Sequence, residues 1–146
     1  LTNWETLKRQ EKGQATHTDS LNAVARSLPA LWRAEKVQGK AKKAGFDWPE
    51  VSGALDKLSE ELDELKAAIA AGSNVEEELG DLLFAAVNVS RFIQTDPEAA
   101  LGKACDKFIS RFSAVELGAA RQGRRLEELS LTELDALWDD AKHNRT

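Results

Sequence analysis

LSEELDELKAAIAAGSNVEEELGDLLFAAVNVSRF, residues 58–92, contains two clusters of acidic residues, and the second cluster leads into one of the most apolar segments of the chain. Leucine recurs at helical spacing in its first half, which predicts a helix that ends at Gly72. Asn74, with Glu77 three residues later, resembles a capping box and predicts a second helix that continues to about Gln94. Because the turn between them is short, we expect the two helices to pack antiparallel.

Start and stop signals elsewhere in the chain predict further helices. Start and stop signals for these helices lie at Pro29 and Gly45, at Pro97 and Gly123, and at Ser130 with Glu133. No segment has the alternation of a β-strand. The sequence therefore predicts an all-α fold, an antiparallel helical bundle of about five helices.

The chain has 146 residues, which is the usual size of one domain. Residues 1–27 are polar without a sustained period and predict an N-terminal arm or linker, so residues 28–146 are expected to form the helical domain. The chain lacks methionine and begins with Leu1. Because removal of an initiator methionine needs a small second residue, we expect the natural protein to continue N-terminally.

The net charge is −5, and the basic residues are scattered, which argues against a nucleic-acid partner. No apolar run approaches the length of a membrane span, so no membrane partner is expected. The one cysteine, Cys105, has no second cysteine with which to pair and is expected to be a packed thiol. These features predict a cytoplasmic protein.

The acidic residues near the centre of the chain are placed by helical geometry. Glu60, Glu61 and Glu64 share one face, opposite the leucine stripe, and alone they are typical of a solvated surface. Glu78 and Asp81, in contrast, lie on a helix that is apolar nearly all round, which predicts that this helix is buried. Buried carboxylates must be paired, protonated or bound to metal.

Bases are scarce on these two helices, since only Lys57, Lys66 and Arg91 are present. A divalent cation is the simpler partner for the carboxylates, and oxygen ligands favour Mg²⁺, Mn²⁺ or Ca²⁺ over zinc. A di-iron bundle would need Glu-x-x-His pairs. Because His17 and His143 lie far from these helices in sequence, that alternative is disfavoured.

The two acidic motifs, EExxE at residues 60–64 and ExxD at residues 78–81, together resemble those of the MazG family of all-α nucleoside triphosphate pyrophosphohydrolases. Three flanking segments resemble the same family: GFDWP at 45–49, EELGDLLFAAVNVSR at 77–91 and KACDKFISRF at 103–112. The likeness covers most of the chain and is to the C-terminal domain of two-domain MazG proteins.

The resemblance implies roles for particular residues. The implied Mg²⁺ ligands, with Mn²⁺ as an alternative ion, are Glu61, Glu64, Glu78 and Asp81, with Glu60 and Glu77 as supporting or alternate ligands. Glu60 or Glu61 is the candidate general base. The candidates for substrate binding are Lys107, Arg111 and a third base, Lys103, for the triphosphate, Asn88 for a bound water or ligand, and Trp138 for the nucleotide.

The implied activity is Mg²⁺-dependent hydrolysis of ribo- or deoxyribonucleoside triphosphates to monophosphate and pyrophosphate, in a homodimer that maintains nucleotide pools. Phe46, Trp48, Trp32 and Trp138 are candidates for a platform under the base, although such aromatics more often belong to a core. Two alternatives remain open at this point. One is a non-catalytic helical dimerisation module, and the other is a sensor that binds the nucleotide without cleaving it.

Overall fold

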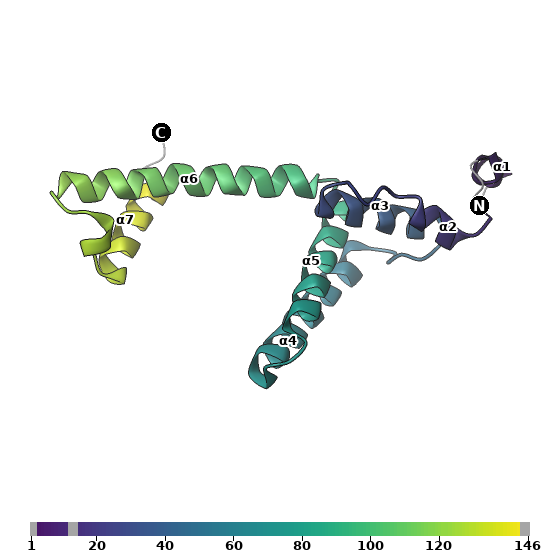
Figure 1. Cartoon of the computed structure of the whole chain (residues 1–146), viewed down its shortest axis with the longest axis horizontal. Coiled ribbons are helices and arrows are strands. Elements are labelled where there is room, and N and C mark those ends of the chain that lie inside the picture. The colour runs from purple at the N-terminus through teal and green to yellow at the C-terminus, as the bar shows by residue number, and fades with distance from the viewer. Residues whose placement is uncertain (1–2, 12–14, 144–146) are drawn as a thin grey trace. The chain divides into compact units, whose positions relative to one another are not determined.

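The computed structural model describes residues 3–11 and 15–143, without the side chain of Arg9. Within these residues the chain forms seven α-helices, one 3₁₀ helix and no strand (Figure 1). The elements are α1 (Asn3–Glu11), α2 (His17–Asn22), α3 (Ala30–Lys43), α4 (Val51–Ala71), α5 (Val75–Phe92), α6 (Pro97–Arg121), η1 (Leu126–Glu128) and α7 (Leu131–His143). The prediction of an all-α fold is confirmed. Among the described residues, none of the helices combines the length and the hydropathy of a membrane-spanning segment.

The chain divides into two compact units, Leu1–Glu98 and Ala99–Thr146. The first unit contains α1 to α5 and the first residues of α6, and the second contains the remainder of α6 with η1 and α7. The segment predicted as a polar arm carries α1 and α2, and a capping box formed by Thr16 and Asp19 starts α2.

Helices α4 and α5 form a hairpin around the predicted turn (Figure 1). Gly72 ends α4 with φ 69°, a left-handed conformation that glycine adopts without steric cost. The capping box predicted at Asn74 is wrong, because Asn74 has φ 58° and its side chain makes no cap hydrogen bond. Asparagine tolerates this left-handed conformation, which here turns the chain instead of capping α5.

The predicted leucine stripe of α4 is only partly covered, because Leu58 and Leu65 are half-buried. The buried residues of α4 are Ala54, Glu61 and Ala68, each one position before the stripe residues Leu55, Leu62 and Ile69. Those three apolar side chains are 48%, 41% and 61% exposed. Alanines allow two helices to approach closely, so the seam of the hairpin follows the small residues.

Within the single chain, α5 is buried on only part of the apolar surface that the sequence predicts. Ala85, Val87 and Ser90 are buried, whereas Leu79 and Leu83 are 45% and 51% exposed. The reason is geometric, because α5 packs against α4 and α3 and these two helices cover only part of its circumference. The α4–α5 hairpin thus leaves apolar surface on both of its helices.

Helix α3 and the connector after it complete the first unit. The indole Nε1 of Trp32 donates to Asp96 Oδ1 at 2.7 Å, and the same oxygen accepts from the backbone N–H of Glu98 at 3.0 Å. Asp96 therefore caps the start of α6 and ties it to α3. In the connector, Asp47 forms an ion pair with Arg91 of α5 at 2.7 Å.

In the second unit α7 folds back against α6. An added Cβ at Gly118 would lie 2.8 Å from a methyl group of Leu137, so these helices touch at a glycine. The capping box predicted at the start of α7 is confirmed, because Ser130 and Glu133 exchange hydrogen bonds of 3.1 and 3.2 Å. The prediction for Cys105 is wrong, since it is exposed on a stretch of α6 whose residues 101–110 are all exposed.

Candidate functional site

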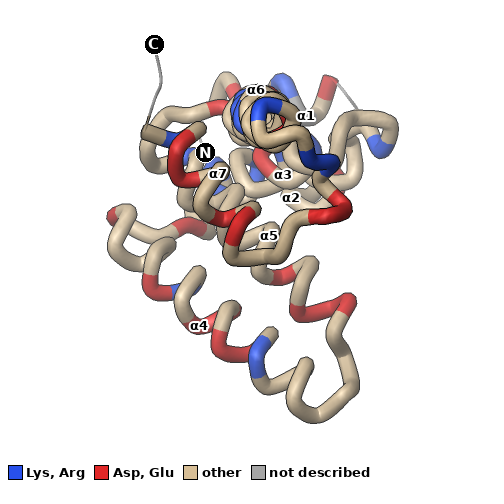
Figure 2. Tube along the Cα trace, turned by 90° about the vertical axis from the view of Figure 1, so that its left-hand side faces the viewer, with Lys and Arg blue, Asp and Glu red and all other residues tan. Residues whose placement is uncertain are grey.

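Three carboxylates of the α4–α5 hairpin converge. Glu61 of α4 and Glu78 and Asp81 of α5 each offer one oxygen, and these three oxygens lie within 4.8 Å of one another. Glu78 and Asp81 project together because they are three residues apart on one helix. Figure 2 shows acidic residues along both helices of the hairpin, with few basic residues among them.

Two of the carboxylate oxygens in this group have no hydrogen-bond partner. Glu61 is 6% exposed, and its Oε1 accepts from Lys57 Nζ at 3.1 Å, whereas its Oε2 is buried without a partner. Glu78 Oε2 is buried and unpartnered in the same way. A buried polar atom without a partner costs about 1–3 kcal/mol, and more if it is charged. Two free carboxylate oxygens beside a third carboxylate fit a hard divalent cation.

Glu64 shares the electrostatic environment of the three converging acids. The negative charge of Glu61 raises the pKa of the Glu64 carboxyl, and burial and the charge of Glu78 act in the same direction. The four acids predicted as metal ligands therefore lie near one another. The arrangement can hold a divalent cation, because a cation would relieve this repulsion.

Lys57 is a site residue that sequence reasoning treated only as a scarce base. Its ammonium group bridges Glu61 at 3.1 Å and Glu60 at 3.3 Å, and these contacts, with Glu61 first, raise the pKa of Lys57. The spacing of three and four residues was a usable signal for these ion pairs. Glu60 is 58% exposed at its side chain, and Glu77 is exposed at the start of α5.

Asn88 belongs to a polar network that the sequence did not predict. Its Oδ1 accepts hydrogen bonds from Nε and Nη2 of Arg91, the first at 3.0 Å. Arg91 also pairs with Asp47, and the two side chains are only 11% and 12% exposed. Because Oδ1 is committed to Arg91, the Nδ2 amide of Asn88 is the group available to a ligand.

The predicted phosphate-binding residues lie in the second unit. Arg111 and Trp138 are brought together, with the guanidinium carbon 5.8 Å from the ring centroid. Arg111 Nε is buried and has no hydrogen-bond partner, and Phe108 packs against Trp138 at a centroid distance of 5.3 Å. Lys107 is exposed one turn before Arg111, and Lys103 is exposed one turn earlier still.

Comparison with known proteins gives a consistent result. Residues 50–115 match the family described as the MazG nucleotide pyrophosphohydrolase domain. A nucleoside triphosphate pyrophosphohydrolase/pyrophosphatase MazG of Thermotoga maritima is 44% identical over 139 residues, which are 95% of this chain and 54% of that protein. A nucleoside triphosphate pyrophosphohydrolase of Escherichia coli K12 is 39% identical over 146 residues, covering 97% of this chain and 56% of its own length.

A third relative is an uncharacterised protein, YabN of Bacillus subtilis, which is 43% identical over 145 residues. The alignment covers 97% of this chain but only 29% of YabN. The chain thus spans about half the length of the first two relatives and less of the third. The converging acids Glu61, Glu78 and Asp81 all fall within the matched residues 50–115. The sequence match and the helical fold show that this chain carries a MazG nucleotide pyrophosphohydrolase domain and belongs to the MazG family.

Proposed function

We propose that this chain hydrolyses nucleoside triphosphates, ribo- or deoxyribo-, to the nucleoside monophosphate and pyrophosphate. The observation that carries the proposal is the convergence of Glu61, Glu78 and Asp81, with two buried carboxylate oxygens that lack a partner. The names of the Thermotoga maritima and Escherichia coli relatives support the same reaction. We assign the activity to residues 28–146, with residues 1–27 as an arm.

The cofactor in this proposal is Mg²⁺, with Mn²⁺ as a substitute, held by Glu61, Glu64, Glu78 and Asp81. Such an ion would neutralise charge on the triphosphate and lower the pKa of a bound water. All four ligands offer oxygen, which is the donor that these ions prefer. Glu77 lies next to Glu78 in sequence and can serve as an alternate ligand.

Glu60 is the better placed of the two proposed general bases. It is exposed and lies outside the group of three converging oxygens, so its carboxylate, which contacts Lys57 through Oε1, is not needed by the metal and can accept a proton from an attacking water. Lys57 contacts both Glu60 and Glu61 and thereby holds the two carboxylates in position. Glu61 remains the alternative base, because its Oε2 has no partner.

Arg111 and Lys107 are the residues proposed to bind the phosphates. Arg111 can bind phosphate oxygens in a bidentate manner, and Lys107 would add a point charge one turn away. The unpartnered Nε of Arg111 supports this role, since a buried guanidinium donor requires an acceptor. Trp138 already stacks on Arg111 and would close over the nucleotide.

A homodimer is the proposed assembly. Leu55, Leu62 and Ile69 recur every seven residues on α4 and are exposed, as are Leu79 and Leu83 of α5. Exposed apolar side chains in such numbers are typical of a protein–protein interface. A second copy of the hairpin would bury them as a bundle of helices.

The direct test is to incubate the chain with a panel of ribo- and deoxyribonucleoside triphosphates, with Mg²⁺ or with a chelator, and to assay both products. We expect metal-dependent formation of monophosphate and pyrophosphate, and loss of both in Asp81→Asn. Asp63→Asn is the matched control, because Asp63 is an exposed acid of α4 outside the converging group. Orthophosphate as the product would refute the cleavage position, whereas binding without cleavage would identify a nucleotide sensor instead.

A further inference from the structure

The first unit contains a second feature with the properties of a ligand site. A cavity of about 450 Å³ lies between α3, the connector after it and α5, and most of its lining is apolar. This volume is within the range of small-molecule sites in proteins. Aromatic side chains form much of its wall, namely Phe46, Trp48 and Phe84. Such a wall suits a flat, heteroaromatic ligand.

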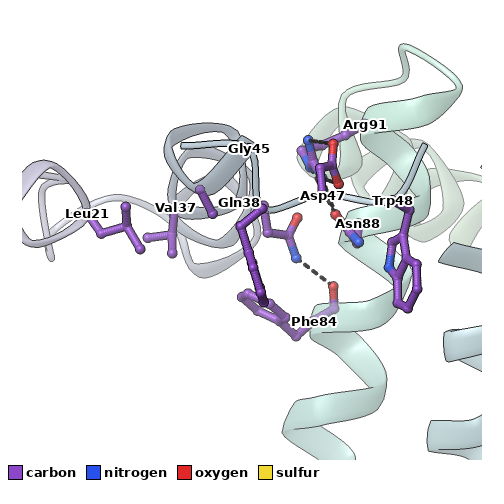
Figure 3. A pocket seen from close by; sticks show the side chains of 11 residues that line it. Leu21, Val37, Gln38, Gly45, Asp47, Trp48, Phe84, Asn88 and Arg91 are labelled. Atoms are coloured by element: carbon purple, nitrogen blue, oxygen red, sulfur yellow. Dashed lines mark hydrogen bonds and ion pairs between the residues drawn. The ribbon is translucent and has the colours of Figure 1, made fainter. Parts of the chain in front are cut away.

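Gln38 gives the cavity a specific polar group. Its side chain is buried, with the residue 5% exposed, and its Nε2 donates to the backbone carbonyl of Phe84 at 2.9 Å (Figure 3). This bond fixes the orientation of the amide, because a carbonyl oxygen can only accept. Gln38 Oε1 is consequently a buried acceptor, and no hydrogen-bond donor within the described residues reaches it. A ligand in the cavity that offers an N–H group would satisfy this oxygen.

Asn88 adds a donor to the same cavity. Its Oδ1 is held by Arg91, which is in turn held by Asp47, and all three residues line the cavity (Figure 3). The Asn88 amide nitrogen is therefore the atom turned away from Arg91. The wall presents an oriented acceptor at Gln38 and an oriented donor at Asn88, and this pair complements a base edge that carries N–H beside a ring nitrogen.

The position of the cavity relates it to the converging acids. Asp81, Phe84 and Asn88 follow one another at spacings of three and four residues, so they share one face of α5. With a rise of 1.5 Å per residue, Phe84 and Asn88 lie about 4.5 Å and about 10 Å beyond Asp81 along the axis. In a nucleotide only a sugar separates the base from the α-phosphate. A triphosphate at the acids therefore places its base near this cavity.

From these observations we infer that the cavity between α3 and α5 binds the nucleobase of the substrate, with Gln38 Oε1 accepting a hydrogen bond from an N–H of the base. Phe46, Trp48 and Phe84 provide the apolar and stacking surface. The inference rests on the proposed hydrolysis of nucleoside triphosphates and adds the part of the site that recognises the base. Adenine is the preferred probe, because its exocyclic amino group is its only N–H donor in a nucleotide.

The test compares two non-hydrolysable ligands, the α,β-methylene triphosphates of adenosine and of purine riboside, which has hydrogen in place of the amino group. Their affinities are measured by titration calorimetry in the presence of Mg²⁺, for the unmodified chain and for Gln38→Met. We expect the unmodified chain to bind the adenosine ligand about 10-fold more tightly, since one hydrogen bond to a buried acceptor is lost with purine riboside. Gln38→Met should bind both ligands alike.

Phe46→Ala provides a second variant, which does not replace a buried side chain and so does not risk the fold. Phe46 is 83% exposed, so its removal should leave the fold intact, whereas loss of a stacking surface should weaken both ligands about 10-fold. Trp4→Ala is the matched control, because Trp4 is an exposed aromatic of α1, 68% exposed, that does not line the cavity. We expect no change in affinity for Trp4→Ala.

The outcomes separate the two proposals. If Gln38→Met keeps the preference for adenosine, or if neither triphosphate binds, the cavity is not the base site. If triphosphates are cleaved while Gln38→Met keeps that preference, the hydrolase proposal stands and the base site is refuted. If the expected preference is found and lost in Gln38→Met but no triphosphate is cleaved, the base site stands and the hydrolase proposal is refuted.

Discussion

Replacing Glu61 by glutamine should change the stability of the chain in opposite directions without and with metal. Without metal, the carboxylate of Glu61 is buried within 4.8 Å of oxygens of Glu78 and Asp81. At this distance two like charges repel by about 0.9 kcal/mol in a water-like medium and by about 3.5 kcal/mol at an effective dielectric of 20. Removing the charge relieves this repulsion from two neighbours. It also loses the ion pair with Lys57, which is 41% exposed and therefore screened.

We therefore expect Glu61→Gln to be more stable than the unmodified chain in chelator, by about 1 kcal/mol, or about 3 °C in Tm. With Mg²⁺ at about 100 times its Kd, the unmodified chain should gain about 2.7 kcal/mol. A variant that has lost one ligand should bind at least about 100-fold more weakly, and at the same concentration it gains only about 0.4 kcal/mol. The order of the two stabilities is thus reversed by the ion.

Thermal unfolding in chelator and across a Mg²⁺ titration measures both effects. Asp63→Asn serves as the control for loss of one negative charge from α4, and its Mg²⁺ response should match that of the unmodified chain. Two results would refute the reasoning: a metal-free Glu61→Gln that is less stable than the unmodified chain, or equal stabilisation of both proteins by Mg²⁺. The first would mean that the ion pair with Lys57 outweighs the repulsion, and the second that Glu61 is not a ligand.

Three further predictions follow from the geometry. The pKa of Glu64 is raised mainly by the charge of Glu61, so the metal-free chain should lose stability as pH rises through that raised value. A Tm scan from about pH 4 to about pH 7 in chelator should show this loss. The increase in Tm on adding Mg²⁺ should grow over the same range. Gly53→Ala should destabilise the chain by about 1–2 kcal/mol in urea unfolding, because its Cβ would lie 2.9 Å from the ring of Trp48. In Gly102→Ala the added Cβ meets no atom within 4 Å, so this substitution should stabilise α6 by up to about 1 kcal/mol. Asp47→Ala leaves Arg91 buried without its carboxylate and should cost about 3 kcal/mol in the same assay, and a cost below about 1 kcal/mol would contradict the pairing.

Local signals in the sequence predicted the ends of the helices better than their packing. Gly72 and the Ser130–Glu133 capping box act through residues next to them, so their effect could be predicted without the tertiary structure. The leucine stripe of α4 was predicted as an apolar face, and the structure covers only part of it: Leu58 and Leu65 are half-buried, whereas Leu62 is exposed. Helical spacing shows which face is apolar, but it does not show whether a neighbouring helix or another chain covers that face.

The candidate site was predictable to a similar extent. The proximity of Glu61, Glu78 and Asp81 followed from two motifs on consecutive helices, because each motif places its acids on one face. Gln38 and Asp47 were missed. Each is a single polar residue more than forty positions away from its partner on α5, and no periodic pattern relates residues at that separation.

The seam of the α4–α5 hairpin gives two alanines an influence over chemistry that they do not touch. Ala54 and Ala68 lie seven residues before and after Glu61, on the same buried face of α4. A larger side chain at either position would push the helices apart and carry the Glu61 oxygens away from those of α5. Substitutions two turns away from Glu61 would then abolish ion binding although every carboxylate ligand is still present. In directed evolution of this chain, inactive variants at positions 54 and 68 should accordingly be explained by a changed distance between α4 and α5, not by the loss of a carboxylate ligand.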